Sequence, residues 1–374
     1  MRRISSTYIH LLKDWPNFTW KNEALVHLLA TVRHKQGRLL GKLEGLGFQL
    51  QAEASLGNLI LDVVKSSEIE GEKLALDQVR SSIARRLGMK VAGMVSVDRN
   101  VEEVVEMMLD ATQKYEHPLD KERLFGWHGA LFPTGRSGLH QIQVATWRDE
   151  TNGPMQVISG AMGKERVHFE APDAARLESE MKKFLKWFNQ AAEIDSIVKA
   201  AIAHLWFVTI HPFDDGNGRI ARAIADMQLS RSDQTKQRFY SMSAQIQKER
   251  QAYYDHLEKT QRGTLDITEW LLWFLNCFDR ALMASDGNVS GVLNKAAFWD
   301  KHRTVALNDR QRTMLNKLMD EFEGKLTSSK WAKITKCSPD TALRDIQNLI
   351  DREILEKETG GGRSTSYTIV KSAI

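Results

Sequence analysis

The sequence predicts a mainly α-helical protein that carries a short β-hairpin and a separate C-terminal module. Long stretches repeat apolar residues at helical spacing, and only seven of the 374 residues are proline. The segment 134–172 instead combines glycines with short alternating runs such as Met155-Gln156-Val157-Ile158, which indicates loops and a β-hairpin. After residue 300 the pattern changes to three short helices and a glycine-turned pair of strands.

The composition is that of an ordinary soluble globular protein. Hydrophobic residues make up 42% and charged residues 27%, so the chain can bury a sizeable core without disulfides or metals. Cys277 and Cys337 lie far apart and match no zinc spacing, which predicts free thiols in a reducing compartment. The most apolar run, 200–210, is interrupted by His204 and is too short to span a bilayer. We therefore expect a cytoplasmic protein without membrane contact. The net charge of +4 permits nucleotide or nucleic-acid binding but argues for neither.

Taken in chain order, the helical pattern begins near residue 20. One or two helices are expected over 20–50, and another over 52–70, ended by Gly71. Further helices are expected over 72–88, 100–115, 120–131, 173–189, 196–210, 217–229, 244–260 and 267–282. The helix over 196–210 is apolar on all sides, which is typical of a buried central helix.

The C-terminal part has the element order of a winged helix-turn-helix. A polar, glycine-bearing stretch, 285–291, is predicted to be the linker before it. Two helices are expected over 328–336 and 340–350, and strands over 354–359 and 366–370 flank three glycines. As a DNA reader, the module would place Arg344 and Asn348 in the major groove and Arg363 on the backbone or minor groove. Asp345 and neighbouring acids weaken its attraction for DNA, and winged helices also serve as dimerisation or protein-docking modules, so both roles stay open.

The stretch 211–222 carries the residue types of a phosphate-binding loop. Gly216 and Gly218 permit a sharp loop that leads into a helix starting near Asn217. The free N–H groups and the positive end of such a helix favour anions. Arg219 and Arg222 lie three residues apart on one helix face, so both can reach the same phosphate chain.

Asp215 and His211 add the remaining chemistry to this stretch. Asp215 offers a hard oxygen for Mg²⁺, which typically binds one or two carboxylates together with substrate phosphates. His211 is the group whose pKa suits it to accept a proton near neutral pH. A base, a metal ligand and a phosphate cradle within twelve residues predict a phosphoryl- or nucleotidyl-transfer site.

The same stretch resembles the Fic-family signature, His-x-Phe-x-(Asp/Glu)-Gly-Asn-Gly-Arg-x-x-Arg, and matches it at every fixed position. The resemblance implies a Fic helical core with a β-hairpin flap, and an enzyme that transfers AMP from ATP to a Ser, Thr or Tyr hydroxyl of a target protein. It implies that His211 is the general base, that Phe213 anchors the loop and that Asp215 binds Mg²⁺. The implied phosphate contacts are Gly216, Asn217, Gly218 and Arg219 for the α- and β-phosphates, and Arg222 for the γ-phosphate.

Further segments resemble the same family. The segment 155–170 lies where Fic proteins place the flap that holds the target chain as an added strand. By this resemblance the nucleotide is lined by Val157, Ile158, Ser159 and Gly160. Tyr253, Tyr254 and Gln261 fall where related enzymes hold the adenine, and many relatives carry Asn at the position of Gln261. The resemblance covers roughly residues 100–280, and the N-terminal helices resemble the helical extension of many bacterial Fic proteins.

A second motif precedes the Fic-like region. The stretch 66–71, Ser-Ser-Glu-Ile-Glu-Gly, matches the family's inhibitory motif (Ser/Thr)-x-x-x-Glu-(Gly/Asn). Ser66 and Glu70 lie four residues apart, on one face of a helix, and Gly71 follows them. The resemblance implies that Glu70 pairs with Arg222, occupies the arginine that the γ-phosphate needs and leaves ATP misplaced for in-line attack.

We therefore expect three domains: an N-terminal helical domain over 1–98, a Fic catalytic domain over 99–284 and a winged helix-turn-helix over 300–374. The expected partners are ATP, Mg²⁺ and a target protein, and a homodimer stays open. Two alternatives also stay open. One is a DNA-binding regulator whose Fic core senses a nucleotide, and the other is a Fic enzyme that also removes AMP. The intact His211 and Asp215 favour an enzyme, because a sensor needs no base.

Overall fold

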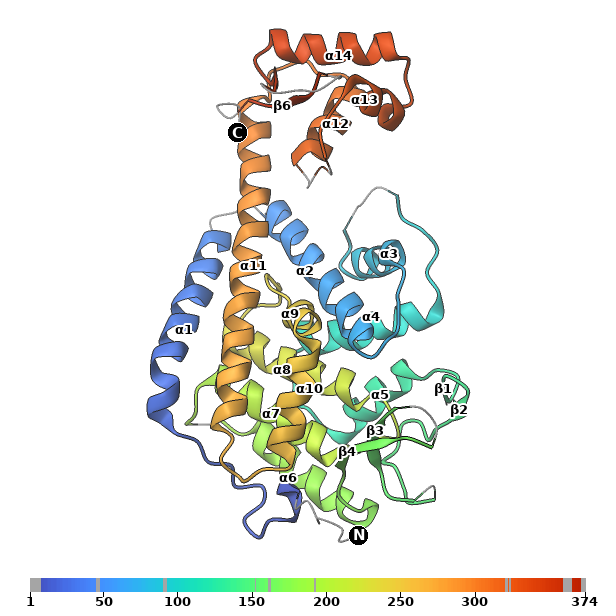
Figure 1. The fold of residues 1–374 in the computed structure, drawn as a ribbon, viewed down its shortest axis with the longest axis vertical. Helices are drawn as coiled ribbons and strands as arrows, with labels where there is room; N and C mark the ends of the chain where they lie inside the picture. Colours follow the sequence, from blue (N-terminus) through green and yellow to red (C-terminus); the bar gives the residue numbers. More distant parts are fainter. Residues whose placement is uncertain are drawn as a thin grey trace. The chain divides into compact units, whose positions relative to one another are not determined.

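The computed structural model describes residues 8–44, 48–89, 93–151, 153–160, 163–191, 193–319, 322, 324–358 and 365–370. These residues are mainly helical, as the sequence predicts. The chain divides into two compact units, Met1–Ser285 and Asp286–Ile374, and each is considered by itself (Figure 1). Within the described ranges, no helix combines the length and the apolar character that a membrane crossing requires.

The first unit is built from helices and two small hairpins. Its helices before the second hairpin are η1 (Ile9–Leu11), α1 (Asn22–Glu44), α2 (Phe48–Ile69), α3 (Leu76–Arg86), α4 (Arg99–Gln113) and α5 (Lys121–Leu131). The antiparallel hairpins are β1 (Arg136–Ser137) with β2 (His140–Gln141), and β3 (Gln156–Ser159) with β4 (Arg166–Glu170). The helices that follow are η2 (Ala174–Arg176), α6 (Leu177–Asn189), α7 (Ser196–Ile210), α8 (Asn217–Asp233), α9 (Met242–Lys248), α10 (Arg250–Gln261) and the first part of α11 (Thr268–Lys301).

The centre of this unit is the pair formed by α7 and α8, which pack more extensively on each other than any other two elements named here (Figure 1). Every residue of α7 from Ile197 to Ile210 is buried, which confirms the expected central helix. Asp195 caps its start by accepting a hydrogen bond from the Ile197 N–H, and Trp270 of α11 donates to the Ala201 carbonyl at 2.9 Å. The loop between α7 and α8 is the glycine-rich stretch that the sequence singles out.

A buried ionic cluster ties α2 to α8. Arg238 is fully buried and contacts Asp226 of α8 at 2.6 Å and Asp62 of α2 at 3.8 Å, and Asp233 lies 3.9 Å away. Three carboxylates thus share one guanidinium. Burial and repulsion from Asp226 raise the pKa of Asp62, although Arg238 and the Ser241 hydroxyl oppose the shift. A proton on Asp62 at neutral pH lowers the excess of negative charge in the cluster.

Two expectations about element boundaries are corrected. The one or two helices expected over 20–50 correspond to α1 and the start of α2, with residues 45–47 outside the described ranges. The single helix expected over 244–260 is broken at Glu249 into α9 and α10. The linker expected over 285–291 is wrong, because α11 runs through it. Gly287 and Gly291 each cost a helix only about 1 kcal/mol relative to alanine, and the same helix buries Val289 and Phe298.

The second unit holds the last part of α11, α12 (Asp309–Met319), α13 (Ser328–Thr335), α14 (Pro339–Asp351) and the antiparallel pair β5 (Leu355–Lys357) and β6 (Tyr367–Ile369). Its core gathers side chains from all of these elements; the largest are Phe298, Met314, Trp331, Ile346, Leu349 and Tyr367. Helix, turn, helix and hairpin lie where the sequence places them, and the assignment of a DNA-reading winged helix stays a prediction. Arg363 and the three glycines before it lie outside the described residues.

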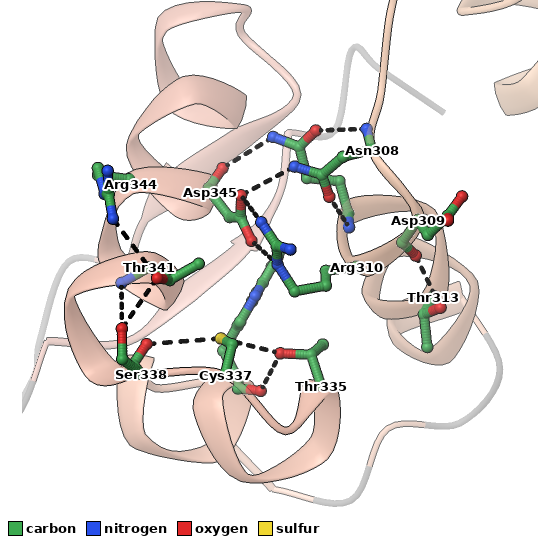
Figure 2. Close-up of polar contacts among 12 residues, drawn as sticks. Asn308, Asp309, Arg310, Thr313, Thr335, Cys337, Ser338, Thr341, Arg344 and Asp345 are labelled. Carbon is green, nitrogen blue, oxygen red and sulfur yellow. Dashed lines mark hydrogen bonds and ion pairs between the residues drawn. The ribbon is translucent and has the colours of Figure 1, made fainter.

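Asp345 on α14 points inward rather than to solvent, as Figure 2 shows. Its carboxylate accepts hydrogen bonds from Arg310 at 2.7 and 3.1 Å and from Asn308 at 2.9 Å. Arg344, by contrast, is exposed, and Asn348 accepts a hydrogen bond from Gln311 at 3.1 Å. Asp345 is therefore a paired core residue, and the expectation that its charge weakens the module's attraction for DNA is corrected.

The packing of Phe298 predicts that the second unit needs the end of α11 to fold. A fragment of residues 286–374 should unfold cooperatively, because it contains the whole core just named. Phe298→Ala should lower its free energy of unfolding by about 3–5 kcal/mol, because the ring is fully buried. Urea unfolding of both proteins measures the difference. Leu343→Ala on the exposed face of α14 is the control, and equal losses for the two variants would contradict the assigned core.

Candidate functional site

The loop between α7 and α8 makes its turn at two residues with left-handed backbone. His211 ends α7 with φ 52°, and its N–H still donates to the Phe207 carbonyl at 3.0 Å. Gly216 precedes α8 with φ 79°, a conformation that glycine adopts without the strain of a side chain. A Cβ at Gly216 would also lie 2.9 Å from the Phe132 ring. This position therefore requires glycine for two independent reasons.

Two side chains fix the loop from its buried side. Phe213 is fully buried and stacks on the His128 ring, with centroids 4.1 Å apart and an interplanar angle of 12°. Asn217, at the start of α8, accepts from the Phe213 N–H at 3.0 Å and donates to the Phe213 carbonyl at 2.8 Å. The Asn217 side chain thus pairs both the N–H and the carbonyl of Phe213. The loop is held to the helix that follows it.

Arg148 braces the other side of the loop. Its guanidinium donates to the His211 carbonyl at 2.8 Å and to the Pro172 carbonyl at 2.5 Å, and its backbone N–H donates to the Pro212 carbonyl at 2.9 Å. Arg148 is buried, and burial lowers its pKa. The sequence analysis missed this residue, because it lies in an irregular segment with no periodic pattern or motif around it.

The imidazole of His211 is arranged to accept a proton. Its Nδ1 lies 3.2 Å from the Val208 carbonyl, a contact that requires a proton on Nδ1 and leaves Nε2 as the acceptor. Burial lowers the pKa of His211 to about 4, and the charge of Arg148 acts in the same direction, whereas the Val208 carbonyl, Asp215 and Glu70 oppose it. His211 is therefore neutral at pH 7.

Asp215 is half-buried at the centre of the loop. One carboxylate oxygen accepts from the Gly216 N–H at 2.6 Å, and the other accepts from the Ser137 hydroxyl of β1. Each donor uses one lone pair, so the Asp215 oxygens keep their remaining lone pairs for a cation. Among the described residues no group of three or more His, Cys, Asp or Glu side chains could hold a metal ion. A single carboxylate nevertheless fits Mg²⁺, because phosphates supply the other oxygens.

The first two turns of α8 bury two arginines, and each contacts a glutamate from the turn after α2. Arg222 Nη2 lies 2.8 Å from Glu70 Oε1, and Arg219 Nη1 donates to Glu72 Oε2 at 2.7 Å. Both arginine side chains are almost fully buried, whereas Glu70 is 30% and Glu72 48% exposed. Arg219 Nε and Arg222 Nη1 are buried without a hydrogen-bond partner among the described residues. Each arginine thus keeps a donor for an anion that enters the site.

Ser66, at the start of the motif at the end of α2, also contacts Arg222. Ser66 is buried, its hydroxyl accepts from Arg222 Nε at 2.9 Å, and its carbonyl accepts from Arg222 Nη2 at 2.9 Å. Gly71 has φ 87° and turns the chain after Glu70. Gly218 lets the two helices meet here, since a Cβ at that position would lie 2.3 Å from Glu70 Oε1. Glu72 was missed, although it is an acid only two residues beyond the motif.

The three residues expected around the adenine differ in burial and in their contacts. Tyr253 is buried, and its hydroxyl lies 2.9 Å from His204 Nε2 of α7. Gln261 is also buried and donates to the Thr209 hydroxyl at 3.3 Å. Tyr254 is half-buried and donates to Glu70 Oε2 at 3.4 Å. Tyr254 is therefore the member of this set that the structure brings to the Glu70–Arg222 pair.

The hairpin of β3 and β4 is docked on α10. Arg262, directly after α10, donates to the Val167 and His168 carbonyls at 2.6 and 2.8 Å, and Glu258 of α10 contacts His168 Nδ1 at 2.6 Å. Ile158, Ser159 and Gly160 are exposed on this hairpin, and Val157 is half-buried. Glu258 and Arg262 were not predicted, because a pair on one helix face resembles any surface salt bridge in sequence.

Comparison with known proteins connects this geometry to one family. Residues 118–229 match the model of the "Fic/DOC family", and residues 8–89 match a "Domain of unknown function (DUF4172)". The chain is 29% identical over 230 residues to "Protein adenylyltransferase Fic" of Aedes aegypti, and 33% identical over 230 residues to the protein of that name from Culex quinquefasciatus. Each alignment covers 60% of this chain and 41% of the relative, so the chain spans about two fifths of these relatives.

Solved structures show the same fold. A Fic family protein from Desulfovibrio desulfuricans superimposes with a TM-score of 0.54 and 21% identity, over 95% of this chain and 98% of that chain. A Fic domain containing signaling protein from Bacteroides thetaiotaomicron superimposes with a TM-score of 0.51 and 20% identity, over 70% of this chain and 97% of that chain.

The double hydrogen bond of Asn217 predicts a stability test for the loop. Asn217→Ala should lower the free energy of unfolding by about 1–3 kcal/mol, because it leaves the buried Phe213 N–H and carbonyl unpaired. Asn276→Ala is the matched control, since this exposed asparagine only donates to a carbonyl of its own helix, and it should change stability by less than about 0.5 kcal/mol. Denaturant unfolding compares the two, and equal effects would show that Asn217 does not hold the loop.

Proposed function

Since the chain is a Fic-family protein with a complete signature loop, we propose that it is a protein adenylyltransferase. It transfers AMP from ATP to a Ser, Thr or Tyr hydroxyl of a target protein and releases pyrophosphate. The observation that carries this proposal is His211, whose Nε2 is left to accept a proton, at the turn before α8, whose first two turns bury two arginines with unused donors. The adenylyltransferase relatives support AMP as the transferred group.

In this mechanism His211 Nε2 takes the proton of the attacking hydroxyl, because Nδ1 is already engaged by the Val208 carbonyl. The hydroxyl oxygen bonds to the α-phosphorus of ATP, and the bond to the β-phosphate bridging oxygen breaks. Arg219 and Arg222 hold the phosphate chain, together with the N–H groups at the start of α8. Asp215 would hold Mg²⁺ together with the substrate phosphates, and the ion would supply positive charge beside the leaving pyrophosphate.

The β3–β4 hairpin supports the choice of a polypeptide as the acceptor. It is a two-stranded sheet with exposed residues on β3, including Ile158, whose side chain is 54% exposed. An extended segment of another chain can pair with the edge of such a hairpin and present its hydroxyl to the loop. Docking on α10 through Arg262 and Glu258 keeps this edge in place.

We also propose that the turn after α2 inhibits the enzyme. Glu70 and Glu72 occupy Arg222 and Arg219, the two arginines that the phosphates need. A nucleotide must therefore displace an existing ion pair before its α-phosphate is aligned. Glu70 contributes most of this effect, because Glu72 is about half exposed and water screens its pair.

A DNA-binding regulator with a nucleotide-sensing core is the alternative, as is an enzyme that also removes AMP. A sensor would bind ATP without needing the base at His211. AMP removal would require a group that activates water. Glu70, which pairs with Arg222, is the candidate for this task. The two experiments that follow separate these functions from AMP transfer.

The first experiment tests the base. His211→Ala should abolish AMP transfer and keep ATP binding, because the base contributes little to ground-state affinity. In the parent protein kcat/KM should fall as the pH drops through about 4, and not through 6.5, because His211 must be neutral to accept the proton. Labelled ATP, Mg²⁺ and a cell lysate measure the rate, with circular dichroism as the control for folding at low pH. Transfer at the parent rate in His211→Ala would exclude His211 as the base, whereas ATP binding without any transfer in the parent protein would leave the sensor.

The second experiment tests the inhibition. Glu70→Gly should raise the rate of AMP incorporation on the order of ten- to a hundredfold, because a charge-assisted pair contributes roughly 1.5–3 kcal/mol and 1.36 kcal/mol corresponds to about tenfold. Glu72→Gln should raise it by a smaller factor, and the double variant should exceed either single one. Arg222→Ala should not mimic Glu70→Gly, since it removes the phosphate contact as well.

Glu68→Gln is the matched control for this series. Glu68 lies in the same turn but pairs with Lys65 at 2.8 Å, so its neutralisation should leave the rate unchanged. The inhibitory role of Glu70 fails if Glu70→Gly and Glu68→Gln give the same rate as the parent. Release of AMP from a labelled target that depends on Glu70 would instead establish the removal reaction.

A further inference from the structure

A second cavity lies at the far end of the α7–α8 pair. Its volume is about 750 Å³, and its walls come from the segment after α4, the end of α6, the start of α7 and the end of α8. Its most informative lining residues are Tyr115, Glu116, Phe188, Lys199, Gln228 and Arg231.

This cavity is separate from the loop at His211. Lys199 lies in the first turn of α7, whereas His211 follows its last residue, and eleven residues of helix separate Lys199 from Ile210, or roughly 16 Å. Arg231 lies in the last turn of α8, whereas Arg219 and Arg222 lie in its first two turns. The two sites therefore occupy opposite ends of the same two helices.

The cavity contains two cations that lack an acidic partner. Lys199 is 5% exposed, and its ammonium donates to the Gln190 carbonyl at 2.6 Å. Arg231 stacks on the Phe188 ring at 4.6 Å and donates to the Tyr115 and His117 carbonyls at 2.8 and 3.1 Å. Among the described residues no carboxylate lies within ion-pair distance of either group. Glu116 is the acid in the lining, and it is exposed.

Carbonyl contacts compensate these charges only in part. An ammonium has three donors, and one of those on Lys199 is used by Gln190. Burial and repulsion from Arg231 lower the pKa of Lys199 to about 8, which shows that its surroundings disfavour a positive charge without cancelling it. A buried charge with spare donors beside an open cavity is a feature that an anion would stabilise.

We propose that this cavity binds a small phosphate-bearing anion, held by the free donors of Lys199 and by the charge of Arg231. Such a ligand supplies the counter-charge that the described residues lack. The cavity volume accommodates an organic group beside the phosphate, so free phosphate and a nucleoside monophosphate share the chemistry that the site recognises. The site requires neither His211 nor ATP turnover and goes beyond the proposed function.

Calorimetric titration of the full chain tests this proposal, with phosphate, pyrophosphate and AMP as probes at constant ionic strength. Lys199→Met should weaken binding of the best probe at least tenfold, because it removes the buried charge and keeps the volume of the side chain. Glu116→Gln should tighten binding a few-fold, because it removes the acid in the lining. Lys199→Arg keeps the charge and should retain binding, which guards against a Lys199→Met protein that does not fold.

Arg219→Ala separates this cavity from the loop at the other end of the helices. It should leave binding in the cavity unchanged, because Arg219 lies in the first turn of α8. Tighter binding of AMP than of phosphate would assign an organic phosphate, and equal binding would assign the free ion. The proposal is overturned if no probe binds saturably, or if Arg219→Ala removes binding while Lys199→Met retains it. It is also overturned if Lys199→Met lowers only stability, because Lys199 would then merely cap the end of α6.

Discussion

Two guanidinium groups buried at the start of α8 impose the constraint on which the site depends. A buried charge is costly unless another charge or several hydrogen bonds meet it, so Arg219 and Arg222 must be accompanied. Glu70, Glu72 and Ser66 accompany them in this structure, and a phosphate chain would do the same in a nucleotide complex. The carboxylates of the turn after α2 and the phosphates of a nucleotide can therefore each neutralise the two arginines. In the proposed function, inhibition and catalysis use the same two side chains for this reason.

The turn that holds His211 depends on residues that are distant in sequence. Asn217 lies in the following helix, but Arg148 and His128 come from the segments before it and are fixed by their own packing. The same scaffold withdraws His211 from water and keeps it neutral. The position of the base and its protonation state thus have one structural cause.

Local patterns in the sequence predict the parts of the protein that local chemistry decides. The buried helix α7, the β3–β4 hairpin and the loop 211–222 follow from periodicity, turn residues and glycine spacing. Other contacts depend on the tertiary arrangement, and no local spacing in the sequence predicts them. Examples are Arg148 with His211, Glu72 with Arg219 and Arg262 with β4. The linker expected over 285–291 fails for a related reason. Glycine and polar residues argue against a helix, but burial of Val289 and Phe298 along α11 outweighs that preference.

The cluster of Asp62, Asp226 and Arg238 determines how the proposed inhibitory turn can move. Asp62 lies one helical turn before Ser66 on α2, and its buried carboxyl accepts a hydrogen bond from the Ser241 hydroxyl and lies 3.8 Å from Arg238, so moving the body of this helix would break buried polar contacts. Moving the whole helix away is therefore costly, whereas unwinding its last turn breaks the contacts of Ser66, Glu70 and Glu72 and exposes the buried Ile69. The proposed inhibitory element can therefore move while the body of α2 stays packed in place. A partner that releases it needs to bind only residues 66–72.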